Sequence, residues 1–89
     1  MTEKSDDPLT FPRRWPVKAM VETGKNALRD VLDVIGRHAE LPAEDEVGIR
    51  PSRTGRYESI TVVIEAQSRE QLETIYGELK DLPAVRMTL

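Results

Sequence analysis

One stretch decides the fold, Arg50-Pro-Ser-Arg-Thr-Gly-Arg-Tyr-Glu-Ser-Ile-Thr-Val-Val-Ile-Glu-Ala66, in which a turn rich in Ser, Thr and Gly leads into an alternating segment. Alternate side chains of this segment fall on opposite sides of an extended chain: Ile60, Val62, Ile64 and Ala66 on one side, and Tyr57, Ser59, Thr61, Val63 and Glu65 on the other. A period of two is typical of a strand with one face in a core and the other partly wet. The stretch therefore predicts a hairpin turn followed by a β-strand over Tyr57–Ala66.

Length and composition indicate one small domain. The chain has 89 residues, no cysteine and a net charge of −3. We expect a disordered N-terminal tail over residues 1–10, which are polar and lack periodicity, and a single domain over residues 11–89. The first residues lack the apolar run of a signal peptide, no segment is long enough to span a membrane, and nothing requires disulfides, so the sequence predicts a cytoplasmic protein.

The segments before the hairpin continue the same pattern. Apolar residues alternate over Arg14–Glu22, which predicts a first strand, and recur at helical spacing over Lys25–Ala39, which predicts a helix. A second strand is expected over Glu46–Ser52. Because Pro51 has no N–H to donate, this strand is expected either to lie at an edge of the sheet or to end there.

The segments after the hairpin complete the fold. Ser68 followed by Gln71 matches a capping box, which predicts that a helix begins there and runs over Arg69–Lys80. A last strand is expected over Ala84–Leu89. The order β-α-β-β-α-β predicts an α+β ferredoxin-like sandwich, with a four-stranded antiparallel sheet, the first and third strands in the middle, and both helices on one face.

Several short motifs resemble those of a known family. They are Phe11-Pro12, Val17-Lys-Ala-Met20, Arg37-His-Ala39, Arg50-Pro-Ser-Arg-Thr-Gly-Arg-Tyr57 with Ser59, Gln71-Leu-Glu-Thr-Ile-Tyr76 and Val85-Arg-Met-Thr-Leu89. In this order they resemble the YbeD-like family of small bacterial proteins over residues 11–89. The resemblance implies a ferredoxin-like fold similar to ACT regulatory domains, and a regulatory, non-enzymatic role without a cofactor. It supplies no site residues.

The sheet face without helices is the first candidate surface. The expected strands place these side chains on it: Lys18, Met20, Ser59, Thr61, Val63, Arg86 and Thr88. Such a mixed face could bind a metabolite or a protein partner, pair with a second copy, or simply remain solvated. Lys18 is also expected to form a cross-strand pair with Glu65, which is a structural alternative to a functional lysine.

The hairpin is the second candidate. It carries the basic residues Arg50, Arg53 and Arg56 together with the hydroxyls of Ser52 and Thr54. Guanidinium groups and exposed loop groups can bind a carboxylate or phosphate. Arginines also keep a turn soluble, so the sequence leaves both interpretations open.

An RNA-recognition-like protein is the alternative from another functional class, because that module has the same topology and reads RNA with aromatic side chains on its central strands. Here Tyr57 and the hairpin arginines would serve that purpose. Trp15, however, falls on the predicted core face, and the negative net charge argues against nucleic acid.

The sequence predicts neither an enzyme nor a metal protein. His38, the only histidine, is expected in the last turn of the first helix, where it would interact with the helix dipole. The nearby acids have no recognisable metal-ligand spacing. An acylphosphatase-like loop is also missing after the first strand, because Thr23-Gly-Lys-Asn26 contains no arginine.

Overall fold

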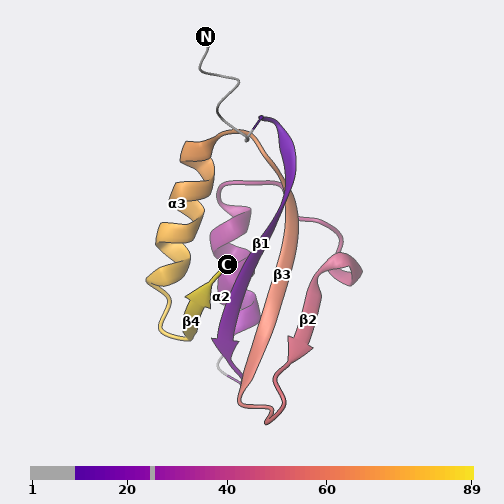
Figure 1. Cartoon of the computed structure of the whole chain (residues 1–89), viewed down its shortest axis with the longest axis vertical. Coiled ribbons are helices and arrows are strands. Elements are labelled where there is room, and N and C mark those ends of the chain that lie inside the picture. The colour runs from indigo at the N-terminus through magenta and orange to yellow at the C-terminus, as the bar shows by residue number, and fades with distance from the viewer. Residues whose placement is uncertain (1–9, 25) are drawn as a thin grey trace.

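The computed structural model describes residues 10–24 and 26–89, and its elements follow the predicted order (Figure 1). They are β1 (Arg13–Glu22), α2 (Ala27–Gly36), a short 3-10 helix η1 (Glu44–Glu46), β2 (Gly48–Pro51), β3 (Tyr57–Ala66), α3 (Arg69–Lys80) and β4 (Val85–Thr88). The predicted tail lies outside the described residues except for Thr10, which is exposed. No helix in the described ranges is long and apolar enough to cross a membrane.

The four strands form one antiparallel sheet in the order β2-β3-β1-β4, with both helices on one face (Figure 1). The central pair is in register along its whole length, from Arg13 opposite Ala66 to Glu22 opposite Tyr57. The predicted α+β fold class is therefore confirmed, as are the central positions of β1 and β3. The edge position of β2, one of the two alternatives expected from Pro51, is confirmed as well.

The core lies between the helices and the sheet face that they cover. Its β3 side chains are those that the alternation predicted, Ile60, Val62, Ile64 and Ala66, each at most 2% exposed. The remaining core side chains come mainly from β1 and the two helices: Val17, Ala19, Val21, Ala27, Val31, Val34, Ile35, Leu72, Ile75 and Leu79. Removing these apolar surfaces from water, at about 25 cal/mol per Å², is the main force that holds the layers together.

The helix α3 begins as its sequence predicts. Ser68 is the N-cap, and its Oγ accepts a hydrogen bond from the N–H of Gln71 at 3.0 Å. The Gln71 side chain does not close the capping box on Ser68. Its Oε1 accepts from the N–H of Gln67 at 2.6 Å, and its Nε2 donates to the carbonyl of His38 at 2.7 Å. Gln71 therefore connects the start of α3 to the segment that follows α2.

The helix α2 is shorter than predicted. It begins at Ala27, after Asn26, which has a left-handed backbone with φ of 56°, and it ends at Gly36. Lys25, the predicted first residue, lies outside the described residues. The N–H groups of Arg37 and His38 bond to Val34 and Ile35 in tighter turns, so the predicted end at Ala39 is wrong. Apolar spacing continued past the helix because Ala39 still packs against the core.

The last strand contains a bulge that the sequence analysis did not predict. Thr88 lies opposite Ala19 and Met87 opposite Met20, but Val85 lies opposite Val21, so Arg86 is an extra residue at a bulge. A one-residue shift moves side chains to the other face of a sheet. Thr88 therefore shares the face of buried Ala19, and its predicted position on the uncovered face is wrong. Met87 lies there instead.

The second strand is also shorter than predicted. The acidic residues Glu44–Glu46 form the 3-10 helix η1, and β2 includes only Gly48–Pro51. Its register against β3 places Gly48 opposite Thr61 and Arg50 opposite Ser59. These two pairs extend the uncovered face of the central strands toward the edge of the sheet.

Candidate functional site

The uncovered face of the sheet, called the open face below, brings together side chains from four segments. On the central strands, Lys18 lies opposite Thr61 and Met20 opposite Ser59. The pairing of β2 adds Arg50 beside Ser59. On the other side, the N–H of Leu89 donates to the carbonyl of Lys18 at 3.0 Å, so the chain beyond β4 borders the same place.

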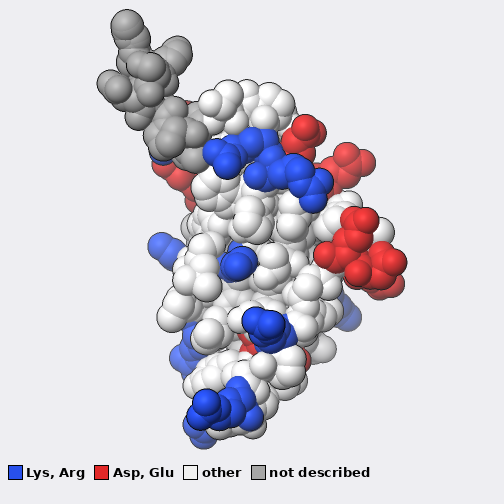
Figure 2. Space-filling view, turned by 45° about the vertical axis from the view of Figure 1, so that its right-hand side comes forward, with Lys and Arg blue, Asp and Glu red and all other residues white. Residues whose placement is uncertain are grey.

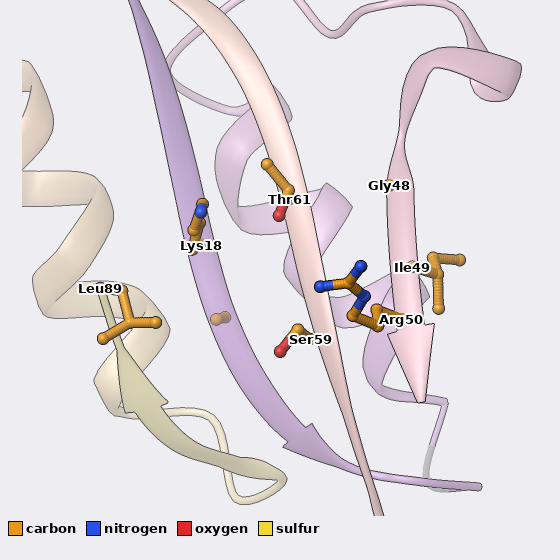
Figure 3. Close-up of a pocket in the computed structure, with 8 residues that line it drawn as sticks. Lys18, Gly48, Ile49, Arg50, Ser59, Thr61 and Leu89 are labelled. Atoms are coloured by element: carbon orange, nitrogen blue, oxygen red, sulfur yellow. The ribbon is translucent and has the colours of Figure 1, made fainter. Parts of the chain in front are cut away.

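These residues surround a hollow of about 380 Å³ in the middle of the open face, called the central hollow below (Figure 3). It is lined by Lys18, Ala19, Gly48, Ile49, Arg50, Ser59, Thr61 and Leu89. Figure 3 shows the guanidinium group of Arg50 extending from β2 over β3, toward the space between Ser59 and Thr61. Lys18 extends from β1 on the same face of the sheet, opposite Thr61.

The two cations of the central hollow have no acidic partner among the described residues. The ion pairs described in the structure involve other bases, among them Arg37 with Glu78 and Arg86 with Glu22. The predicted pair of Lys18 with Glu65 is wrong, because Glu65 lies opposite Arg14, four residues away from Lys18 along β1. In Figure 2, basic groups occur from one end of the displayed surface to the other, separated by uncharged residues, while acidic groups gather mainly near its upper right.

The chemistry of the hollow suits an anion. A lysine and an arginine supply charged donors, and the hydroxyls of Ser59 and Thr61 supply neutral ones. Charge-assisted hydrogen bonds to carboxylate or phosphate are about twice as strong as neutral ones. Gly48 has no side chain opposite Thr61, so nothing on β2 fills the hollow at this position.

The structure divides the hairpin residues that the sequence grouped together. Arg50 belongs to the central hollow. Ser52 and Thr54 instead stabilise the turn: Ser52 Oγ accepts from the N–H of Tyr57 at 3.2 Å, and Thr54 Oγ1 accepts from the N–H of Arg56 at 3.3 Å. Arg50 is thus separated from the other hairpin residues, and anion binding by the hairpin itself stays a prediction.

The other hairpin arginines lie in a different environment. Arg53 is exposed in the turn, away from the central hollow. Arg56 and Tyr57 border a separate hollow of about 520 Å³ at the hairpin end, together with Thr23 and the ion pair between Arg86 and Glu22. The carboxylate of Glu22 in this second hollow makes it less suitable for an anion than the central one.

The only histidine lies on the helix side of the sheet. His38 follows the end of α2, so its predicted place in the last helical turn is wrong, and its Nε2 lies 3.0 Å from Glu78 Oε1 of α3. The contact joins the two helices. Nowhere in the described residues do three histidine or acidic side chains gather closely enough to hold a metal ion.

The aromatic residues do not form a base-stacking surface. Trp15 is half-buried against the core, as its predicted face requires, and its Nε1 donates to the hydroxyl of Tyr76 at 2.9 Å. On the open face of β1 and β3, within the described ranges, Tyr57 is the one aromatic residue, and it lies at the end of β3. RNA modules that use this topology need aromatic rings nearer the centre.

Sequence reasoning missed four residues that line the central hollow, namely the core residue Ala19 together with Gly48, Ile49 and Leu89. The register of β2 was the missing information for Gly48 and Ile49, because the hairpin loop length alone did not define it. Leu89 was placed with Val85 and Met87 on one face, but the bulge at Arg86 breaks that alternation. No signal in the sequence marked the bulge.

The comparisons with known proteins place the chain in a family. The family model described as "Protein of unknown function (DUF493)" matches residues 6–89. A UPF0250 protein of Chromobacterium violaceum is 36% identical over 100% of both chains. The UPF0250 protein YbeD of Salmonella arizonae is 35% identical, again over 100% of both. The resemblance to the YbeD-like family is thus confirmed.

Solved structures share the fold. The solution structure of HP0495 from H. pylori has a TM-score of 0.71 at 18% identity, covering 100% of this chain and 94% of the other. The ACT domain from GTP pyrophosphokinase of Chlorobium tepidum has a TM-score of 0.68 at 10% identity, covering 85% of this chain and 94% of the other. The likeness to an ACT domain expected from the motifs is confirmed for the fold. The chain therefore belongs to the family described as a protein of unknown function (DUF493), together with the UPF0250 proteins and YbeD.

Proposed function

We propose that this protein is a non-catalytic regulatory module that binds a carboxylate or phosphate group of a metabolite or partner in the central hollow of its open face. The observation that carries the proposal is a pair of cations, Lys18 and Arg50, beside two hydroxyl groups in the central hollow. Neither cation has a carboxylate partner among the described residues. These two cations lie on one face of a protein whose net charge is −3.

The likeness to an ACT domain supports a regulatory rather than catalytic role, although it is a likeness of fold. The composition of the hollow agrees with that role. It contains donors for an anion but no histidine or carboxylate that would serve as a general base, and His38 lies in the helix layer beside Glu78.

The test is a titration of the protein with inorganic phosphate and with succinate, at micromolar protein and low ionic strength. We expect the amide resonances of Ser59 and Thr61 to shift and the melting temperature to rise with anion concentration. In the double variant Lys18→Met, Arg50→Met, which keeps the aliphatic stems, both effects should disappear.

The matched control removes the same two charges from the hairpin. The variant Arg53→Met, Arg56→Met should retain the anion-dependent shifts and the rise in melting temperature, because neither residue lines the central hollow. If the hairpin variant loses the response and the Lys18 and Arg50 variant keeps it, the site is at the hairpin and the proposal is wrong. A response that survives in both variants, or that is absent from the unmodified protein, also overturns it.

A further inference from the structure

The outer edge of β1 is longer than the strand that covers it. On one side β1 pairs with β3 along all of its 10 residues. On the other side, β4 pairs only with Ala19, Met20 and Val21, and the N–H of Leu89 reaches the carbonyl of Lys18. No described strand pairs with the outer edge of residues 13–17. Figure 1 shows the short arrow of β4 and the C-terminal residue beside the middle of β1.

The alternation of a strand identifies the backbone groups on this edge. The carbonyl of Lys18 and the N–H of Glu22 both bond toward the β4 side, to Leu89 and to Ala84. Backbone groups of every second residue point the same way in a strand. The N–H and carbonyl of Arg14 and the carbonyl of Pro16 are therefore directed toward the uncovered edge.

The side chains around these groups are basic and accessible. Arg13, Arg14, Pro16 and Lys18 are exposed. With Trp15 and Leu89 they line a hollow of about 390 Å³ that contains no acidic residue. The guanidinium carbon of Arg13 lies 5.6 Å from the centre of the Trp15 ring, which holds that cation beside the edge.

We propose that the outer edge of β1, from Arg13 to Lys18, binds an extended acidic segment of a protein partner, which adds to the sheet as a further strand. Such strand addition takes its affinity from main-chain hydrogen bonds and its specificity from alternate side chains. Here Arg14 and Pro16 supply main-chain groups, while Arg13, Arg14 and Lys18 select acidic side chains. The proposal does not depend on anion binding in the central hollow.

A second copy of the chain fits this edge poorly. Antiparallel pairing of two such edges centred on Pro16 would place Arg14 of one copy opposite Lys18 of the other. Like charges directly opposite each other destabilise a strand pair. Pro16 would also face another proline, so neither copy could donate a hydrogen bond at the centre. An acidic strand meets neither obstacle.

The experiment uses the whole protein labelled with ¹⁵N and a short peptide of alternating glutamate and valine. We expect shifts in the resonances of β1 and slower hydrogen exchange at the Arg14 amide when the peptide is added. A peptide of alternating lysine and valine should bind at least tenfold more weakly. The same acidic peptide with N-methyl groups at alternate positions keeps its charge but cannot pair, and it should not protect the Arg14 amide.

Two variants separate charge from pairing. Arg14→Ala removes a cation and keeps the N–H, whereas Arg14→Pro removes both, so the proline variant should bind the acidic peptide about tenfold more weakly than the alanine variant. Arg13→Glu with Arg14→Glu should reverse the preference toward the lysine peptide. Arg50→Met should leave binding unchanged, which distinguishes this edge from the central hollow.

Other results would overturn the proposal of strand addition at β1. Equal binding of the N-methylated and unmodified acidic peptides would show attraction without strand addition and overturn the proposal. Absence of binding at millimolar peptide would do the same. If the proline variant does not fold, the comparison of the two acidic peptides still decides.

Discussion

The hydroxyl of Tyr76 joins the start of β1 to the chain beyond β4. It accepts a hydrogen bond from Trp15 Nε1 at 2.9 Å and donates to the carbonyl of Leu89 at 3.0 Å. We expect Tyr76→Phe to lower the free energy of unfolding by about 1–2 kcal/mol, because the half-buried indole N–H loses its acceptor. Urea unfolding followed by the fluorescence of Trp15, the only tryptophan, measures the loss.

Tyr57→Phe is the control for this prediction. It makes the same chemical change, and the hydroxyl of Tyr57 has no hydrogen-bond partner in the described part of the protein, where only its backbone N–H and carbonyl are bonded. Its stability should change by less than about 0.5 kcal/mol. Equal losses in the two variants would contradict the role assigned to Tyr76.

Gln71 gives a prediction that opposes a simple sequence rule. Either glutamate or glutamine at this position completes a capping box. Here, however, the amide Nε2 donates to the carbonyl of His38 at 2.7 Å, and a carboxylate cannot donate. We expect Gln71→Glu to lower the free energy of unfolding by about 1 kcal/mol at pH 7, measured by urea unfolding.

The pH dependence of that variant tests the explanation. A protonated carboxyl group can donate to the His38 carbonyl, which raises the pKa of the introduced carboxyl group in the folded protein. The difference from the unmodified protein should therefore shrink as the pH falls toward about 4.3, the ordinary pKa of glutamate, and be small below it. The contact with the His38 carbonyl disfavours the charged carboxylate. The loss of stability should therefore be present at high pH, where the introduced carboxyl group is ionised. A penalty of the same size at pH 3.5 and pH 7 would contradict the role of the donated hydrogen bond.

Single residues also mark the limit of prediction from the sequence. Lys18, Ser59 and Thr61 were correctly placed on the open face, because strict alternation defines which way a central strand directs its side chains. Arg50 was selected as a hairpin residue, and its position beside Ser59 depends on a register that only the folded sheet defines. The central hollow was therefore predictable in its residues on β1 and β3, but not as a site.

At the scale of elements, replacing either of two glycines with alanine is expected to change the free energy of unfolding, in opposite directions. Gly55 lies in the hairpin with φ of 79°, and Gly77 lies within α3, and no atom lies within 4 Å of a Cβ added at either position. Gly55→Ala should lower the free energy of unfolding by about 1 kcal/mol or more, because an L-residue is strained at positive φ. Gly77→Ala should raise it by about 1 kcal/mol, because alanine favours a helix.

Thermal and urea unfolding of both variants measure these changes. Since neither added methyl group meets a neighbour, packing contributes to neither result, and the sign of each change depends on the backbone alone. A stabilised Gly55→Ala protein would mean that the hairpin turn has another conformation in solution. Loss of stability in Gly77→Ala would contradict the assignment of that residue to the interior of α3.

The elements differed in how well the sequence defined them. The bounds of β3 and α3 were predicted correctly, since alternation marks the whole of one and the Ser68 cap marks the start of the other. The bounds of α2 were not, because Asn26 in a left-handed conformation delays its start and apolar spacing continues through the mixed turn that follows the helix end at Gly36. In β4 the bulge at Arg86 changed the facing side chains, which no periodicity can predict.

At the scale of the whole molecule, topology followed from the order of elements. Two right-handed crossovers in a chain of this length leave little choice except a sheet with the first and third strands in the middle. The helices then cover one face, as observed (Figure 1). What the order of elements could not define is the balance of charge and apolar surface on the uncovered face, because that depends on registers at both edges of the sheet.

The charges and apolar side chains of the open face together predict the oligomeric state. Two exposed apolar side chains lie on the open face at its β4 side, with Met87 49% and Leu89 64% exposed, and they would favour pairing of two open faces. Lys18 and Arg50 lie on the same face, and face-to-face pairing would bring these cations together without a compensating acid in the hollow. We expect the protein to sediment as a monomer at low ionic strength, because burying unpaired charges costs more than the apolar contacts return.

Removing the charges should reverse this result. The variant Lys18→Met, Arg50→Met keeps the apolar surface and loses both cations, so it should form dimers at protein concentrations where the unmodified chain is monomeric. Arg53→Met with Arg56→Met removes the same charge from the hairpin and should stay monomeric. Sedimentation velocity over a range of protein concentrations separates these outcomes. A dimer of the unmodified protein at low ionic strength that persists in both variants would mean that the cations of the open face do not control self-association.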